Sequence, residues 1–445
     1  MIHIFSFLLI FGLLTAEGFL LFTAISRTRG ERLIALLLGY PLGALLNALI
    51  FFALNIFNIP FGILSVGISH ALIIAGLYSI CRNIRNFDSI NLSISSLPPR
   101  KTQKVLVVVC VSLLAAVLIG SSLKAIFIPS YYWDIFYNWA MQAKQYYFAG
   151  EFLTEGVQKP HYPVLLRTIQ MVHMLIPGWS DTLSNASTLA LSFTIFGSLF
   201  VFIKRIVNTE CALITCTFFS AIPIAVIHME QGYADIHLAG YLLLSALLLE
   251  QALKNNNTKL LTISSLLCAG AAWTKMEGFY FGVMPWIAFV GIDAFLNKRW
   301  KSNLLYGIIP LILIAIAWPI WILSQGLLLT PNETGLGFYL ADYKMILRKM
   351  FIFGSFGVHW YAITAGLLLL IPARNRMHMQ SWRMILWGIG VVLLLIGIYL
   401  FTEEVKWLRQ RTAFTRAMIF PTMLLTQALA MHYYRIFRPS TPHQP

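Results

Sequence analysis

The chain has 445 residues, of which 58% are hydrophobic and only 11% are charged. Soluble domains carry about 25% charged residues, so this composition excludes a soluble globular protein and indicates a chain that crosses a membrane many times. The formal net charge of +15 would suggest nucleic acid in a soluble chain, but most Lys and Arg lie in short loops between apolar segments. Membrane topology explains that pattern better, so no nucleic-acid partner is expected.

Apolar segments recur along the whole chain. A membrane-spanning helix needs about 20 apolar residues. About thirteen segments come close to this length, and they predict an all-α polytopic membrane protein. They are residues 4–25, 33–56, 60–80, 105–127, 185–203, 210–228, 236–253, 259–274, 279–296, 303–326, 351–372, 383–401 and 417–435.

The loops between these segments suggest four parts. The first holds three leading spans, the second is a cytoplasmic linker with two prolines, the third is a core with one long polar loop, and the fourth holds the late spans and loops. These parts are residues 1–80, 81–104, 105–296 with its loop at 128–184, and 297–445.

Basic residues alternate from loop to loop, which predicts the orientation. Loops rich in Lys and Arg are usually cytoplasmic, so the N-terminus is expected outside and the C-terminus inside. The informative polar segments then share the outer side of a plasma membrane. They are residues 128–184, 228–235, 275–278, 327–350 and 402–416.

The first outer loop contains the leading catalytic candidate. Asp134 follows the span at 105–127 closely, and aromatic residues surround it in the sequence. The spacing predicts one interfacial helix from Asp134 to Phe148 and another from Pro163 to Leu175. A carboxylate at this interface could remove a proton from an acceptor hydroxyl. Equally, Asp134 could cap the helix that begins at Ile135.

The next outer turn carries acids close to the membrane. Glu230, Asp235 and His237 could bind a divalent cation, since oxygen ligands and imidazole suit several metals. Glu230 and Asp235 are the candidate metal ligands. The alternatives are hydrogen bonds from these side chains to a substrate, or a role as helix caps.

Two further places could bind a substrate. Lys275 could neutralise a phosphate, and Glu277 could hold Lys275 or accept a hydrogen bond from a sugar hydroxyl. The alternative is a simple surface pair of the two. His161, held between Pro160 and the Tyr162–Pro163 pair, could contact a phosphate or a sugar hydroxyl, although a single loop histidine is often structural.

Late cations break the orientation rule. Arg409, Arg411 and Arg416 are predicted to be external, where they could grip a phosphate through bidentate hydrogen bonds. Alternatively they contact lipid headgroups. Because external cations are disfavoured by the orientation rule, the phosphate role is preferred.

Several of these residues resemble the sequence patterns of one family. The sequence is similar to membrane-embedded glycosyltransferases of the C superfamily (GT-C), and especially to bacterial members related to protein mannosyltransferases and aminoarabinose transferases. The resemblance covers roughly 105–280 well. The similar residues are Trp133-Asp134, Trp139, Ala143-Lys144, His161 through Leu166, Gly232 through Asp235, Ala272 through Gly278, and Arg416 with Pro421.

The resemblance implies a GT-C-like fold and an enzyme of the cell envelope, in the bacterial inner membrane. It implies an inverting glycosyltransferase, with Asp134 as the catalytic residue and His161 and Tyr162 beside the substrate. The donor would be a polyprenyl-phosphate sugar, and the acceptor a lipid or glycan more readily than a protein. Ile135 replaces the family's second acid, which leaves a divalent cation open, and no other cofactor is expected.

Two other classes of function remain open. A transporter or flippase of lipid-linked glycans would also need outer cations and contact with membrane lipids. An O-antigen ligase or polymerase would need a large late outer loop, and the late loops here are short. The sequence has no nucleotide-binding GxxxxGK[ST] or GxGxxG pattern, which favours a lipid-linked donor.

Overall fold

The computed structural model describes residues 2–27, 32–84, 101–129, 132–329, 335–373, 379–410 and 413–437. Most of the described residues are helical. Across the described ranges, the only β-type pairing is one isolated bridge between Leu336 and Thr402. The all-α polytopic fold predicted from the sequence is therefore confirmed.

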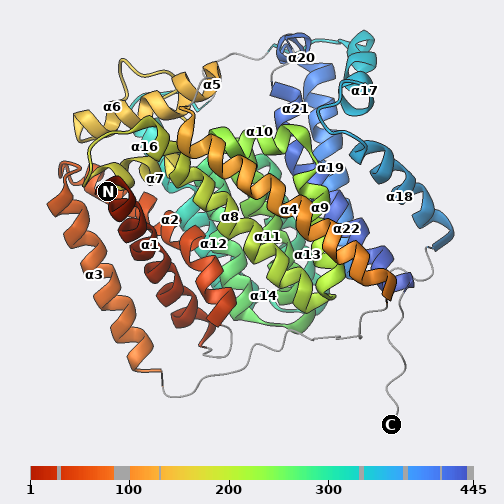
Figure 1. Ribbon diagram of the computed structural model, residues 1–445, viewed down its shortest axis with the longest axis horizontal. Coiled ribbons are helices and arrows are strands. Elements are labelled where there is room, and N and C mark those ends of the chain that lie inside the picture. Colours follow the sequence, from red (N-terminus) through yellow and green to blue (C-terminus); the bar gives the residue numbers. More distant parts are fainter. Residues whose placement is uncertain are drawn as a thin grey trace. The chain divides into compact units, whose positions relative to one another are not determined.

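The apolar segments form long helices (Figure 1). Nine helices in the described ranges are long and apolar enough to cross a membrane, or ten if one bent pair counts as a single span. Each of the predicted segments lies largely in helix, but some helices are short; α12 has 17 residues and α18 has 15. The expected number of about thirteen spans is thus not reached by this criterion.

The chain separates into two compact units. Unit 1 comprises residues 1–91, 121–198 and 229–331, and unit 2 comprises residues 92–120, 199–228 and 332–445. The predicted linker at 81–104 lies mostly outside the described residues. The division into leading spans, core and late spans remains a prediction.

Unit 1 contains the three leading helices and most of the predicted core. Its helices within or reaching into the unit are α1 (Ile2–Ser26), α2 (Arg32–Ile56), α3 (Ile63–Arg82), the end of α4 (Lys101–Phe127), α5 (Trp133–Ile135), η1 (Phe136–Ala140), α6 (Met141–Ala149), α7 (Leu165–Met174), the first part of α8 (Asp181–Ile206), α11 (Ala234–Asn255), α12 (Thr258–Thr274), η2 (Phe279–Val283), α13 (Met284–Asn297), α14 (Trp300–Asn303), η3 (Leu304–Ile308), α15 (Ile309–Ala315) and α16 (Ala317–Ser324).

The leading helices pack against the core of unit 1 through α2. Helix α2 contacts α1, α7 and α12, and 72% of its most apolar stretch of 18 residues is buried. Helix α11 lies at the centre of the unit, because its most apolar stretch is completely buried. The long loop and the two short turns that carry the candidate residues lie at the ends of these helices.

Unit 2 holds the late helices together with parts of earlier ones. The earlier parts are the first part of α4, the end of α8, α9 (Thr209–Ser220) and α10 (Pro223–Gln231, up to His228). The late helices are η4 (Leu340–Asp342), α17 (Tyr343–Phe351), α18 (His359–Ala373), α19 (Met379–Phe401), α20 (Val405–Arg409), α21 (Ala413–Ala417) and α22 (Ile419–Phe437).

Several boundaries differ from the sequence prediction. The predicted span at 210–228 is broken between α9 and α10, which meet at 78° where Pro223 begins the second helix. The predicted span at 351–372 begins as a helix only at His359, because residues 352–358 form turns with left-handed Gly354 and Gly357. Glycine adopts this conformation without steric cost.

The long loop at residues 128–184 forms the two helices that its spacing predicts. The first runs through α5, η1 and α6, and the second is α7, which begins at Leu165 and not at Pro163. Segment η1 is a π-helix, which is a wider helical turn. Such turns are rare in proteins, and those that occur are often at functional sites. Its extra residue shifts the buried face, so Phe136 is 41% exposed while Trp139 is 2% exposed.

Candidate functional site

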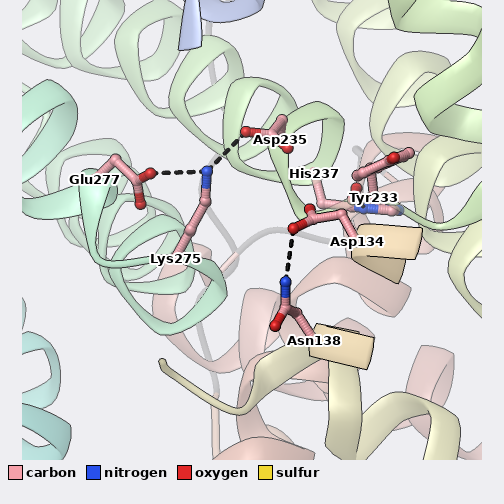
Figure 2. Close-up of polar contacts among 7 residues, drawn as sticks. All are labelled: Asp134, Asn138, Tyr233, Asp235, His237, Lys275 and Glu277. Carbon is pink, nitrogen blue, oxygen red and sulfur yellow. Dashed lines mark hydrogen bonds and ion pairs between the residues drawn. The ribbon is translucent and has the colours of Figure 1, made fainter. Parts of the chain in front are cut away.

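Asp134 lies on the short helix α5, directly before the π-helical turn η1. Its Oδ1 accepts a hydrogen bond of 2.6 Å from Nδ2 of Asn138, one turn further along the chain (Figure 2). Asn138 is 5% exposed, so the bond lies at the edge of the protein interior. Asn138 binds Oδ1 of the carboxylate and does not bind its second oxygen, Oδ2.

Lys275 lies between two carboxylates in the turn after α12. Its Nζ is 2.8 Å from Oδ1 of Asp235 and 2.7 Å from Oε1 of Glu277 (Figure 2). The predicted pairing of Lys275 with Glu277 is present, and Asp235 from the preceding turn joins it. The charge of Lys275 is therefore already offset, and the three side chains together carry a formal charge of −1.

Glu277 keeps one oxygen without a partner. Its Oε2 atom is buried and has no hydrogen-bond partner among the described residues, while Oε1 binds Lys275. A buried acceptor without a donor costs free energy, so such an atom is ready to accept a hydrogen bond from a ligand. A sugar hydroxyl is a donor of the required kind.

The Asp134 turn and the Asp235 turn are adjacent. The ring of Tyr132, two residues before Asp134, lies 6.2 Å from the ring of Tyr233, two residues before Asp235. The sequence separates these tyrosines by about a hundred residues, but both belong to unit 1. The predicted gathering of Asp134, Asp235, Lys275 and Glu277 at one end of the helices is thus visible within this unit.

Glu230 pairs with a lysine, whereas a metal site would bring it together with other metal-binding side chains. Its Oε2 lies 2.9 Å from Nζ of Lys124 at the end of α4, and its Oε1 accepts a 3.4 Å hydrogen bond from Ser121. Glu230 and Asp235 therefore bind two different lysines. Glu230 serves to join α4 to the turn before α11.

His237 is also occupied. Its Nδ1 is 2.8 Å from the carbonyl oxygen of Tyr233, and its Nε2 is close to Thr188 O and Ser192 Oγ. In the described part of the chain, no three His, Cys, Asp or Glu side chains converge as ligands of a metal ion. Within the described structure, the residues predicted as metal ligands therefore do not form a donor set for a divalent cation.

His161 and Tyr162 connect the loop to the late part of unit 1. The carbonyl oxygen of His161 accepts a 2.9 Å hydrogen bond from Nε1 of Trp318, and the Tyr162 ring lies 5.6 Å from that of Trp139. Burial lowers the pKa of His161 to about 4, assisted by Lys159 and Arg167. The imidazole is neutral near pH 7, which suits a hydrogen bond to a hydroxyl better than a charge interaction with phosphate.

An aromatic cluster links this corner to the Lys275 turn. Trp273, two residues before Lys275, lies 6.1 Å from Trp318 and 5.2 Å from Phe52 of α2. Trp273 and Trp318 are both almost fully buried. The cluster fixes the end of α12 against the loop that carries His161.

The late arginines belong to unit 2. Arg409 binds Asp342 with two hydrogen bonds of 3.1 and 2.8 Å, and its side chain is 57% exposed. Arg416 lies on α21 and is half-buried. Arg411 lies outside the described residues. The phosphate role of these three residues therefore remains a prediction.

Asn138 and Arg167 are site residues that the sequence reasoning missed. Asn138 stands four residues after Asp134, a spacing that places the two on one helical face and could have identified it. Arg167 is a single cation in an otherwise largely apolar helix, α7. Lys124, the partner of Glu230, gave no local signal because 106 residues separate the two.

Part of the chain matches a known protein family. Residues 159–322 match the family described as dolichyl-phosphate-mannose-protein mannosyltransferase. The matched segment includes His161, Asp235, Lys275 and Glu277, whereas Asp134 precedes it. No individual curated protein matches the sequence significantly.

Two solved structures share the fold. They are ArnT from Cupriavidus metallidurans in the apo state and bound to undecaprenyl phosphate, each with a TM-score of 0.51 and 14% sequence identity. The similarity covers 72% of this chain and 58% or 59% of the two ArnT chains, so the chain spans less than two thirds of ArnT. Residues 159–322 are thus similar to the mannosyltransferase family, and the fold of the chain is similar to that of ArnT, in agreement with the resemblance predicted from the sequence.

Proposed function

We propose that the protein transfers a sugar from a polyprenyl-phosphate carrier to an acceptor hydroxyl, with inversion at the anomeric carbon. The observation that carries this proposal is the held carboxylate of Asp134, beside a buried network of Asp235, Lys275 and Glu277. The family match and the fold support the class of reaction. One of the ArnT structures contains undecaprenyl phosphate, which supports a lipid phosphate carrier.

In the proposed reaction, Asp134 acts as the general base. Its carboxylate takes the proton of the acceptor hydroxyl as the hydroxyl oxygen attacks the anomeric carbon. The new carbon–oxygen bond forms on the face opposite the phosphate, and the bond between the anomeric carbon and the phosphate oxygen breaks. The electron pair of that bond leaves with the lipid phosphate, and no nucleotide takes part.

The remaining residues would bind the substrates. Glu277, with its unpartnered Oε2, is proposed to accept from a sugar hydroxyl, and Lys275 to hold Asp235 and Glu277 in place. Neutral His161, with Tyr162, is proposed to contact a hydroxyl of the donor or acceptor. Arg409, Arg411 and Arg416 of unit 2 are proposed, from the sequence alone, as residues that can bind a phosphate group.

The reaction is proposed to occur on the outer face of the inner membrane, with the N-terminus outside and the C-terminus in the cytoplasm. This placement follows from the basic residues of the short loops. A lipid or glycan is the proposed acceptor. A donor carried by a lipid stays in the membrane, so both the donor and a membrane-bound acceptor can reach a site at the interface.

The test is sugar transfer by the purified protein. Labelled polyprenyl-phosphate sugars are incubated with membrane lipid and glycan acceptors, using wild type, Asp134→Asn and the control Asp181→Asn. Asp181 is another acid of the same loop, where it accepts a hydrogen bond from Trp179. We expect Asp134→Asn to lower the rate about 10²- to 10⁴-fold, because it removes the base.

Two results would contradict the proposal. Transfer at the wild-type rate by Asp134→Asn would remove Asp134 from its role. Transbilayer movement of the lipid-linked sugar in vesicles, without transfer from any donor, would instead show a transporter.

A further inference from the structure

Arg167 is an unusual residue for its position. It lies on α7, it is completely buried, and it is the only lysine or arginine of that helix. In the part of the chain that the structure describes, its guanidinium has no carboxylate partner, and its Nε makes no hydrogen bond. A buried charge without a counterion costs free energy, so its retention requires a compensating interaction.

The guanidinium is held by backbone carbonyl groups. Nη1 donates to the carbonyl oxygens of Tyr162 at 2.7 Å and Pro163 at 3.2 Å, and Nη2 donates to that of Asn138 at 3.0 Å. The group also lies 4.9 Å from the ring centroid of Trp139. Three carbonyls and an aromatic face stabilise the cation without a carboxylate.

These contacts connect two separate segments of the site. Asn138 belongs to the π-helical turn η1, and its side chain donates to Asp134. Tyr162 and Pro163 follow His161 at the corner before α7. One guanidinium therefore joins the turn that carries the proposed base to the corner that carries a proposed substrate contact.

We propose that Arg167 is a positioning residue, which fixes Asp134 relative to the His161–Pro163 corner by binding the Asn138, Tyr162 and Pro163 carbonyls. The effect of Arg167 on the rate of transfer rests on the proposed function. Its effect on the local backbone is independent of that function, because it follows from the three carbonyl contacts. The planar fork of arginine reaches carbonyls in two directions at once, whereas the single ammonium of lysine keeps the charge and cannot reproduce that geometry.

The decisive comparison uses Arg167→Lys with the control His173→Phe. His173 is also completely buried on α7, but its Nε2 lies 3.0 Å from the hydroxyl of Tyr40 on α2, away from the Asp134 turn. Both substitutions disturb a buried polar group of the same helix. Thermal denaturation in detergent shows whether both variants fold and how far each is destabilised.

The first readout needs no activity. Hydrogen–deuterium exchange of peptides covering residues 134–142 is measured in wild type and in both variants. We expect faster exchange in Arg167→Lys and unchanged exchange in His173→Phe, because only the first loses the carbonyl contacts. Equal exchange in all three, or an equal increase in both variants, would overturn the proposal.

The second readout is the rate of transfer. We expect Arg167→Lys to lower kcat about 10- to 100-fold with little change in KM for the donor, because misplacement of a base affects the chemical step. Adding Asn138→Ala should then lower kcat by less than the product of the two single effects, since both act on Asp134. A wild-type kcat, a loss confined to KM, or fully multiplicative effects would contradict the positioning role.

Failure of the proposed function is seen separately. If the unmodified protein transfers no sugar from any polyprenyl-phosphate donor, the enzymatic proposal fails before any variant is compared. The exchange experiment then decides alone whether Arg167 holds the Asp134 turn.

Discussion

The Nζ atom of Lys275 lies 2.8 Å from Oδ1 of Asp235, and only 10% and 4% of the two side chains are exposed. Glu277 binds the same ammonium group at 2.7 Å. An ammonium group between two carboxylates offsets part of their mutual repulsion, and this attraction is weakly screened because the groups are largely removed from water. Lys275 is therefore central to the stability of the site as well as to its charge.

Replacing Lys275 with Met should strongly destabilise the protein. The substitution removes the ammonium group that both carboxylates contact, and breaking a buried ion pair by removing one partner costs about 3–5 kcal/mol. The free energy of unfolding in detergent measures this effect. The matched control is Arg409→Gln, which breaks the exposed pair with Asp342 and should leave the melting temperature unchanged. Equal stability of Lys275→Met and wild type would refute the expectation.

Trp318→Phe should loosen the corner at His161. The phenyl ring keeps an aromatic contact in the cluster, but the Nε1 donor to the His161 carbonyl is lost. A buried carbonyl without a donor costs about 1–3 kcal/mol. Trp321→Phe is the control, because the Trp321 ring lies 4.8 Å from that of Trp318 and has no such hydrogen bond in the described structure. A smaller loss of stability in Trp318→Phe than in Trp321→Phe would contradict this account.

The stability of the protein should fall on acidification in a way that depends on His161. Its pKa is lowered from 6.5 to about 4 in the folded protein, chiefly by burial. The unfolded chain therefore binds a proton at a higher pH than the folded chain, and stability decreases progressively as the pH falls from 6.5 to 4. Melting temperatures of wild type and His161→Gln across this range test the point. We expect the variant to lose less stability between the two pH values, and parallel curves would exclude a contribution from His161.

The contact between α1 and α2 depends on glycines. A Cβ atom at Gly18 would lie 1.9 Å from the carbonyl oxygen of Gly39, and one at Gly43 would lie 1.9 Å from that of Leu14. Both distances require the helices to move apart, so Gly18→Ala and Gly43→Ala should each destabilise by about 1–3 kcal/mol.

Gly12→Ala is the control for this contact. Gly12 is on the same helix as Gly18, and a Cβ there meets no atom within 4 Å. Alanine should be neutral or slightly stabilising at this position, because it favours helix over glycine. Thermal unfolding in detergent compares the three variants, and equal melting temperatures would show that the close packing is not required.

The sequence alone determined the class of fold and the outline of the site. The length of an apolar run and the polarity of a turn are local properties, so the helices of the membrane core and the turns at Asp134, Asp235 and Lys275 could be found without a structure. The resemblance carried by these residues agrees with the family match over residues 159–322 and with the similarity in fold to ArnT.

Only the tertiary structure decided the partners. Lys275 binds Asp235 across 40 residues and Lys124 binds Glu230 across 106, and no local pattern encodes which lysine meets which acid. The same holds for Arg167, whose partners are backbone carbonyls 29 residues away at Asn138 and nearby at Tyr162. A charged side chain in the interior must be compensated, but the fold selects the group that compensates it, because that choice depends on which chain segments pack together.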